Sequence, residues 1–350
     1  ISIFFDTGLK YSMVRFTLRA MTSPSTSDHH TIESLAAFCK AAGDSLRLGI
    51  LRVLSKNSFG VLELAHIFDM GQSGISHHLK VLTQAGWVAT RREGNAVFYR
   101  RSLAPGSGLQ QALLSRLDTL ALPPDVEARI VEIHHERASA SQAFFQRSAQ
   151  DFNRQQELIA GLYQYHDSLT GLLDKLGFPA SATALEIGPG NGSFLPELAS
   201  RFARVTAIDN STSMLELARQ LCNTHKLQNV ELLLADALTT KLPQADCVLL
   251  NMVLHHFPAP ASALEHIARA VKPGGSLILN ELCAHDQDWA QQACGDLWLG
   301  FEQNELSQWA RQAGLIPGDS IYLGLKNGFQ IQLRQFGKPL THAHNGDSIS

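Results

Sequence analysis

A glycine-rich segment with an acidic residue in front of it offers the clearest chemistry in the chain. Residues 184–192 read Ala-Leu-Glu-Ile-Gly-Pro-Gly-Asn-Gly, so a short apolar strand leads into three glycines at every second position. Glycine allows a tight turn from strand to helix and lets a ligand lie against bare backbone at a helix N-terminus. The carboxylate of Glu186 would repel a pyrophosphate but suits an ammonium group, which indicates S-adenosylmethionine (SAM) rather than NAD.

Polar residues at the ends of the following strands complete this candidate site. Strand and helix patterns alternate from Ala182 on, as in a parallel sheet with crossover helices. Asp209 follows the strand at 204–208, where a carboxylate accepts from ribose hydroxyls, and Asp236 follows the strand at 230–235, beside an adenine amino group. A single acid there could be a helix cap, but successive strands ending this way favour a ligand site. The candidate SAM-binding residues are Glu186, Gly188, Gly190, Gly192, Asp209, Asn210, Met214, Asp236, Ala237 and Asn251.

Two histidines after the fourth strand of this region are the candidate catalytic residues. Methyl transfer from a sulfonium is an in-line displacement that depends on positioning the acceptor, so no triad is required. No metal cluster is visible in the sequence, and we expect no metal. His255 or His256 could deprotonate a hydroxyl or nitrogen acceptor, although packing against Phe257 explains such a histidine as well. The sequence lacks the Asn-Pro-Pro-Tyr and Asp-Pro-Pro-Tyr tetrapeptides of DNA amino-methylating enzymes, so we expect a small-molecule acceptor.

The first third of the chain differs in charge and in pattern. Between Ser45 and Arg101, eight Lys and Arg stand against three Asp and Glu, a net of +5 that leaves −8 for the rest of a chain of formal charge −3. This asymmetry indicates that the basic part meets a polyanion. Two helical patterns joined by a short turn are followed by two strands around a Glu93-Gly94-Asn95 turn, which predicts a winged helix that binds DNA. The candidate DNA contacts are Ser73, Ser76, His77, His78, Lys80, Arg91, Arg92, Asn95 and Arg100.

Both parts resemble known families. Residues 32–103 resemble ArsR/SmtB repressors through Asp44-Ser45-Leu46-Arg47-Leu48, the helix segment 76–82 and the wing 91–95. Residues 180–335 resemble class I SAM-dependent methyltransferases through 186–192, Asp209, Asp236 and Val271-Lys272-Pro273-Gly274-Gly275. These resemblances imply a double-stranded DNA operator and a homodimer for the first part, and a SAM cofactor for the second. The third predicted helix has no cysteine, so a thiolate metal sensor is not expected.

We therefore predict two domains, a mainly α winged helix-turn-helix followed by an α/β Rossmann-like class I methyltransferase domain. The predicted boundaries are a disordered leader at 1–30, the winged helix at 31–104, a helical linker with dimerisation and lid functions at 105–178, the methyltransferase domain at 179–337 and a disordered tail at 338–350. A long helical pattern runs from Asp125 to about Leu173. Five scattered cysteines without a CxxC pair, and no apolar run of ~20 residues, indicate a cytoplasmic protein without a membrane span.

Two hypotheses for the function follow from this organisation. In the first, a DNA-binding transcriptional regulator also methylates a small molecule through its SAM-binding domain. In the second, the methyltransferase fold is a non-catalytic sensor, and SAM or S-adenosylhomocysteine changes the affinity of a repressor for its operator. The acceptor pocket separates the two hypotheses, and a linear sequence does not show it.

Overall fold

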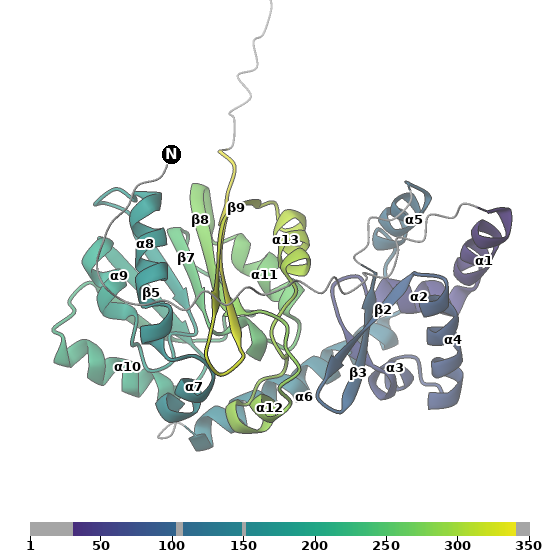
Figure 1. Cartoon of the computed structure of the whole chain (residues 1–350), viewed down its shortest axis with the longest axis horizontal. Helices are drawn as coiled ribbons and strands as arrows, with labels where there is room; N and C mark the ends of the chain where they lie inside the picture. The colour runs from purple at the N-terminus through teal and green to yellow at the C-terminus, as the bar shows by residue number, and fades with distance from the viewer. Residues whose placement is uncertain (1–30, 103–107, 149–151, 341–350) are drawn as a thin grey trace, which may run out of the picture.

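The computed structural model describes residues 31–102, 108–148 and 152–340; the predicted leader, the residues around 105 and the tail from 341 lie outside these ranges. The described chain forms two domains, and the long helix α6 (Pro124–Ser148) runs from the first toward the second (Figure 1). No helix in the described ranges is long and apolar enough to cross a membrane.

The first domain is the predicted winged helix. It comprises α1 (Ile32–Ala42), α2 (Ser45–Val53), β1 (Phe59–Gly60), α3 (Val61–Ile67), α4 (Gln72–Gln84), β2 (Val88–Glu93) and β3 (Ala96–Arg101), with a sheet ordered β1-β3-β2. Asp44 caps α2 by accepting from the backbone N–H of Arg47 at 2.9 Å, which satisfies a group that a helix start leaves unpaired. The indole of Trp87 closes the core by stacking on Phe38 and donating to its carbonyl at 3.1 Å.

A set of helices joins the two domains. These are α5 (Gly108–Asp118), α6, α7 (Phe152–Ala160) and α8 (His166–Leu176). The prediction of one continuous pattern to about Leu173 is wrong at Gly161, where the backbone is extended and the N–H bonds to the Gln164 side chain at 2.7 Å. The first half of α6 belongs to the first domain, because Val126, Ile130 and Ile133 are buried in its core.

The second domain is a seven-stranded sheet with helices on both faces, as predicted. Its strands are β4 (Thr183–Ile187), β5 (Arg204–Asp209), β6 (Val230–Leu234), β7 (Ala245–Asn251), β8 (Val271–Leu282), β9 (Ile316–Gly324) and β10 (Gln330–Gly337), in the order β6-β5-β4-β7-β8-β10-β9. The first five are parallel, and β10 pairs antiparallel with β8 and β9. The covering helices are α9 (Leu195–Arg201), α10 (Thr212–Thr224), α11 (Pro260–Ala268), α12 (Trp289–Cys294) and α13 (Gln303–Gln312). The carboxyl ends of β4 to β7 therefore meet at one edge, where open α/β sheets bind ligands.

Candidate functional site

A cavity opens at this edge of the sheet. Seven of the predicted SAM-binding residues line it: Gly188, Gly190, Asp209, Asn210, Met214, Asp236 and Ala237. Gly188 and Gly190 have φ angles of +64° and +57°, and a Cβ at Gly188 would clash with Val253. Only glycine suits that position, because the left-handed backbone and the missing side chain are both needed there.

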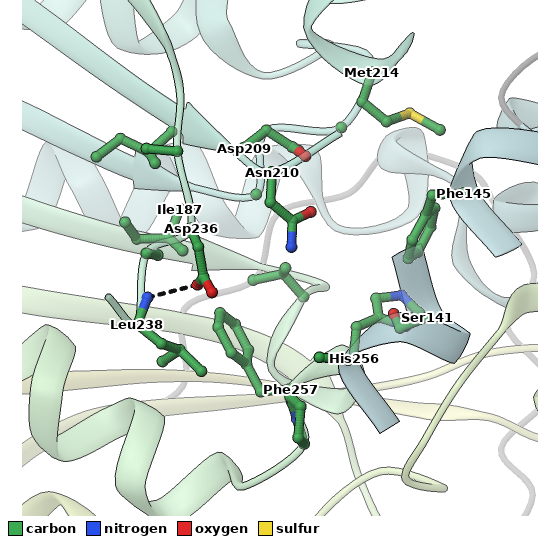
Figure 2. Close-up of a pocket in the computed structure, with 18 of the residues that line it drawn as sticks. Ser141, Phe145, Ile187, Asp209, Asn210, Met214, Asp236, Leu238, His256 and Phe257 are labelled. Carbon is green, nitrogen blue, oxygen red and sulfur yellow. Dashed lines mark hydrogen bonds between the residues drawn. The ribbon is translucent and has the colours of Figure 1, made fainter. Parts of the chain in front are cut away.

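Two carboxylates project from the strand ends into this cavity. Asp209 lies at the end of β5, and its Oδ1 accepts from the N–H of Ser211 at 2.8 Å. Burial raises the pKa of Asp209 to about 6, against the opposing effect of backbone N–H groups. Asp236 is exposed, and its Oδ1 accepts from the N–H of Leu238 at 2.8 Å (Figure 2). Both acids lie where hydroxyl and amino groups of a nucleoside can donate to them.

The three remaining predicted SAM-binding residues do not line the cavity. Gly192 packs behind the loop, where a Cβ would lie 3.0 Å from Ala218. Asn251 accepts from the Asn280 side chain at 2.8 Å. Glu186 is 2% exposed with an Oε2 that has no hydrogen-bond partner, and burial, followed by the charge of Asp209, raises its pKa to about 8.

The residues present fit SAM as a ligand. A buried carboxyl group without a hydrogen bond is costly in a protein, and a cationic ligand in front of the loop would favour the ionised forms of Glu186 and Asp209. The lining is otherwise largely apolar, with Ile187, Met214 and Phe257 around the space. This combination accommodates an adenine ring and a sulfonium better than a phosphate.

The opposite wall of the cavity comes from α6, which the sequence reasoning did not place there. Ala138, Ser141 and Phe145 of this helix line the cavity, and Figure 2 shows Ser141 and Phe145 across the space from Asn210. Their amphipathic spacing marks a helix with a buried stripe, but it carries no information on which surface the stripe covers. The helix that completes the core of the first domain therefore also closes the ligand cavity of the second.

The two candidate catalytic histidines lie where the first cavity meets a second, smaller one. Met252 and His256 line both cavities. His256 donates from Nδ1 to the carbonyl of Gly295 at 3.2 Å, which leaves the lone pair on Nε2. Burial, followed by the neighbouring charge of His255, lowers the pKa of His256 well below its usual value. His256 is thus a neutral imidazole beside the SAM cavity.

His255 is held between two carboxylates that the sequence reasoning did not find. Its Nδ1 lies 2.6 Å from Glu281 and its Nε2 lies 3.6 Å from Asp296. Burial alone would lower the pKa of His255, but these two acids raise it to about 9. Burial raises the pKa of Asp296 to about 7, although the His255 charge opposes the shift.

The predicted DNA contacts divide into an open group and a covered group. Ser73, Ser76, His77, Lys80, Arg92 and Asn95 are exposed on α4 and at the wing. His78 is partly buried, with Nδ1 3.8 Å from Asp44. Arg91 and Arg100 point toward the second domain, and only 10% and 17% of their side chains are exposed.

The wing is docked on the methyltransferase domain by a buried ion cluster. Arg91 and Arg100 both pair with Glu305 of α13, whose side chain is 1% exposed. Arg91 also donates to the carbonyl of Gly300. Glu93 accepts from the backbone N–H of Leu299 at 2.6 Å. These contacts occupy the two arginines and leave Arg92 facing outward.

A second contact between the domains runs through Arg137 of α6. Its guanidinium binds Glu63 of α3 and donates to the carbonyl of Pro258 at 3.0 Å. It also lies 5.3 Å from the ring centre of Phe98 and 5.1 Å from that of Trp298. Pro258 lines the SAM cavity, and Ala138 is the next residue along α6. The cavity and the DNA-binding domain therefore share one continuous set of contacts.

Comparisons with known proteins agree with this two-part organisation. Residues 44–90 match the family described as bacterial regulatory protein, arsR family, and residues 185–279 match the methyltransferase domain family. A ubiquinone biosynthesis O-methyltransferase of Stutzerimonas stutzeri is 30% identical over 159 residues, which cover 41% of this chain and 68% of that protein. The corresponding enzyme of Alkalilimnicola ehrlichii is 32% identical over 151 residues, or 38% of this chain and 60% of the relative.

Two further similarities were found. An uncharacterized 37.1 kDa protein in transposon TN4556 of Streptomyces fradiae is 38% identical over 115 residues, or 31% of this chain and 33% of that protein. The chain thus spans about a third of this relative and less than two thirds of the A. ehrlichii enzyme. Among solved structures, a Synechocystis magnesium protoporphyrin IX methyltransferase with bound S-adenosylhomocysteine is 16% identical and covers 58% of this chain and 99% of its own, with a TM-score of 0.48.

Proposed function

Because the chain belongs to the SAM-dependent methyltransferases and carries an ArsR-family DNA-binding domain in front, we propose that it is a transcriptional regulator that also methylates a small molecule. We place it in the cytoplasm as a homodimer on a double-stranded DNA operator. The observation that carries the enzymatic part is the pair of adjoining cavities, since a methyltransferase needs room for an acceptor beside its cofactor. A pure binding protein would need the first cavity only.

In this proposal the residues of the first cavity hold SAM, which supplies an electrophilic methyl group. Gly188 and Gly190 let the ligand approach the backbone, and Asp209 and Asp236 accept its hydroxyl and amino hydrogens. The acceptor enters the second cavity and meets the neutral imidazole of His256 at the junction. The curated relatives are named as O-methyltransferases, which supports a hydroxyl acceptor here too. Alignment of the acceptor with the methyl group supplies much of the rate enhancement.

Calorimetry with SAM tests the cofactor site directly. The wild-type protein is expected to bind SAM, and Asp209→Ala is expected to bind it at least tenfold more weakly while its operator affinity without ligand stays unchanged. Loss of both properties would show that Asp209 is needed for folding. Transfer of a labelled methyl group to small hydroxyl compounds then tests turnover, and a wild-type protein that does not bind SAM would overturn the proposal.

The sensor hypothesis gains support from the docked wing and from α6. A ligand shifts a two-state protein only if it binds the two states unequally. Because α6 forms one wall of the cavity and part of the first domain's core, SAM can favour the docked state, in which Arg91 and Arg100 are covered. We therefore propose that SAM occupancy lowers operator affinity, with a coupling of ~1–3 kcal/mol.

Operator affinity titrated with SAM, and separately with S-adenosylhomocysteine, tests this second candidate at a fixed salt concentration. The protein's own upstream DNA serves as the probe. A several-fold weakening of operator binding by either ligand is expected. If both ligands bind calorimetrically and neither changes the operator affinity, the domains are uncoupled and only the enzymatic proposal stands.

A further inference from the structure

We propose that the second cavity contains a binding site for one divalent transition-metal ion, formed by His255, His256 and Asp296. One candidate ligand atom from each of these residues lies within 4.8 Å of the other two. A neutral imidazole and a carboxylate are ligands for zinc and its neighbours in the first transition row. The three residues lie at one place in the fold because the 3-10 turn after β7 faces the end of α12.

The hydrogen bond of His255 orients its Nε2 atom toward Asp296, and the hydrogen bond of His256 leaves its Nε2 atom available to a metal ion. His255 uses Nδ1 for Glu281 at 2.6 Å, and His256 uses Nδ1 for the carbonyl of Gly295 at 3.2 Å. Metal-binding histidines typically donate their other ring N–H to a carboxylate or a backbone carbonyl, which fixes the tautomer and the ring orientation. Both kinds of partner are present here, one for each histidine.

The carboxylate of Asp296 supplies an independent indication of a missing ligand. The residue is 4% exposed and lines the second cavity, yet neither carboxylate oxygen has a hydrogen-bond partner. A buried carboxylate without a hydrogen bond is costly, even when an ion-pair partner such as His255 lies nearby. His255 faces it at 3.6 Å, which is longer than a hydrogen bond. An ion between the two groups would satisfy both.

The spacing requires only a small contraction to bind zinc. Bonds of ~2.0–2.2 Å in a tetrahedral site place neighbouring ligand atoms about 3.4 Å apart. The distance between His255 Nε2 and Asp296 is 3.6 Å, within 0.2 Å of this value. The other distances among the three candidate ligand atoms are at most 4.8 Å, so side-chain shifts of about 1 Å would bring these atoms to bonding geometry. Three protein ligands leave a coordination position open, which is typical of catalytic rather than structural zinc.

The open position gives the ion a role that rests on the proposed methyltransferase function. His256 and Met252 line both cavities, so a ligand on the ion would face the SAM site. A bound metal lowers the pKa of a coordinated hydroxyl or thiol. We therefore expect the acceptor to be a small molecule with a hydroxyl or thiol that coordinates the metal. The ion would replace the proton on His255 Nε2.

Cobalt provides the direct test, because bound Co²⁺ absorbs visible light according to its coordination. The full-length protein is stripped with a chelator and titrated with Co²⁺, then with Zn²⁺ in competition with a chromophoric chelator. One ion per chain is expected, with an affinity at least tenfold weaker in Asp296→Asn and His256→Gln. His285→Gln is the matched control, because His285 is a partly buried histidine that lies outside the cluster, and it should bind as the wild type does.

Each outcome of this experiment decides the proposal. Absence of uptake by the wild-type protein, or equal uptake by Asp296→Asn, overturns it and leaves His255 as a protonated imidazole between two acids. Thermal unfolding of each variant shows whether the fold is retained. If Asp296→Asn does not fold, the metal affinity of His256→Gln tests the proposal in its place. Calorimetry with SAM on the same stripped samples separates the two proposals, since SAM binding without metal binding removes only the metal site.

Discussion

Neutralising Glu305 should release the wing and raise the affinity of the protein for DNA. Glu305 is 1% exposed and pairs with Arg91 and Arg100, whose side chains are 10% and 17% exposed. Removing one partner of a buried ion pair costs about 3–5 kcal/mol. Arg91 keeps Glu93 and the carbonyl of Gly300 as partners in the variant, so we use the lower end of this range. A loss of about 3 kcal/mol shifts the equilibrium between docked and released wing by roughly two orders of magnitude.

The assay is fluorescence anisotropy of the protein's upstream DNA without SAM, over a range of salt concentrations. Glu305→Gln should bind at least tenfold more tightly than the wild type. Its salt dependence should be steeper by up to about two units, because two arginines become available for phosphate contacts. Glu265→Gln is the matched control, since Glu265 joins Lys56 of the first domain in a partly exposed pair, which is worth about 1 kcal/mol or less.

A second variant tests the same docking contact in case Glu305→Gln is locally misfolded. Phe98→Ala removes the edge-to-face contact of the wing with Trp298 at 5.3 Å without changing charge, so it should also raise DNA affinity. Thermal unfolding of both variants checks that the domains stay folded. If Glu305→Gln and Phe98→Ala fold normally and bind DNA with the wild-type affinity and salt slope, the docked wing does not restrict DNA binding and the sensor proposal is refuted.

Three further predictions concern single sites. Gly188→Ala should abolish SAM binding measured by calorimetry, because the new Cβ would clash with Val253. Gly177→Ala is the control: Gly177 has a similar φ with open space around it, so this variant should lose only about 1–2 kcal/mol of unfolding free energy and still bind SAM. Equal effects of the two substitutions on SAM binding would contradict this prediction. Burial raises the pKa of Glu186 from 4.5 to about 8, so the folded protein holds a proton that the unfolded chain releases. The free energy of unfolding of the ligand-free protein should therefore fall by up to about 1.4 kcal/mol per pH unit between pH 4.5 and pH 8. Denaturant unfolding of Glu186→Gln should show a shallower pH dependence, and an unchanged slope would refute the role of burial. Arg92→Ala should weaken operator binding and reduce the salt slope by about one, and an unchanged slope would exclude Arg92 from phosphate contact.

Local patterns were enough to predict both domains and most of the candidate residues that line the first cavity. Gly188, Gly190 and the acids Asp209 and Asp236 could be predicted because a strand, a tight turn and a helix start each leave a signal within a few residues. Parallel strands then bring their carboxyl ends to one edge, so the sequence also predicts that these acids meet. The exposed donors of α4 followed in the same way from helical periodicity.

Local patterns could not predict the contacts between segments that lie far apart in the sequence. Arg91 and Glu305 are 214 residues apart, and nothing near Arg91 in the sequence distinguishes an arginine that binds phosphate from one that binds a buried acid. Likewise Asp296 follows α12 with no local sign that it faces His255.

The sequence by itself determined which elements form and which residue types stand at the edge of the sheet, because hydrophobic periodicity and glycine turns act over short distances. Only the tertiary structure decided that α6 closes the cavity at the sheet edge, that the wing is docked and that His255, His256 and Asp296 converge. Side-chain pairing across domains depends on how finished elements pack, and that packing is set by shape and charge over the whole surface of each element.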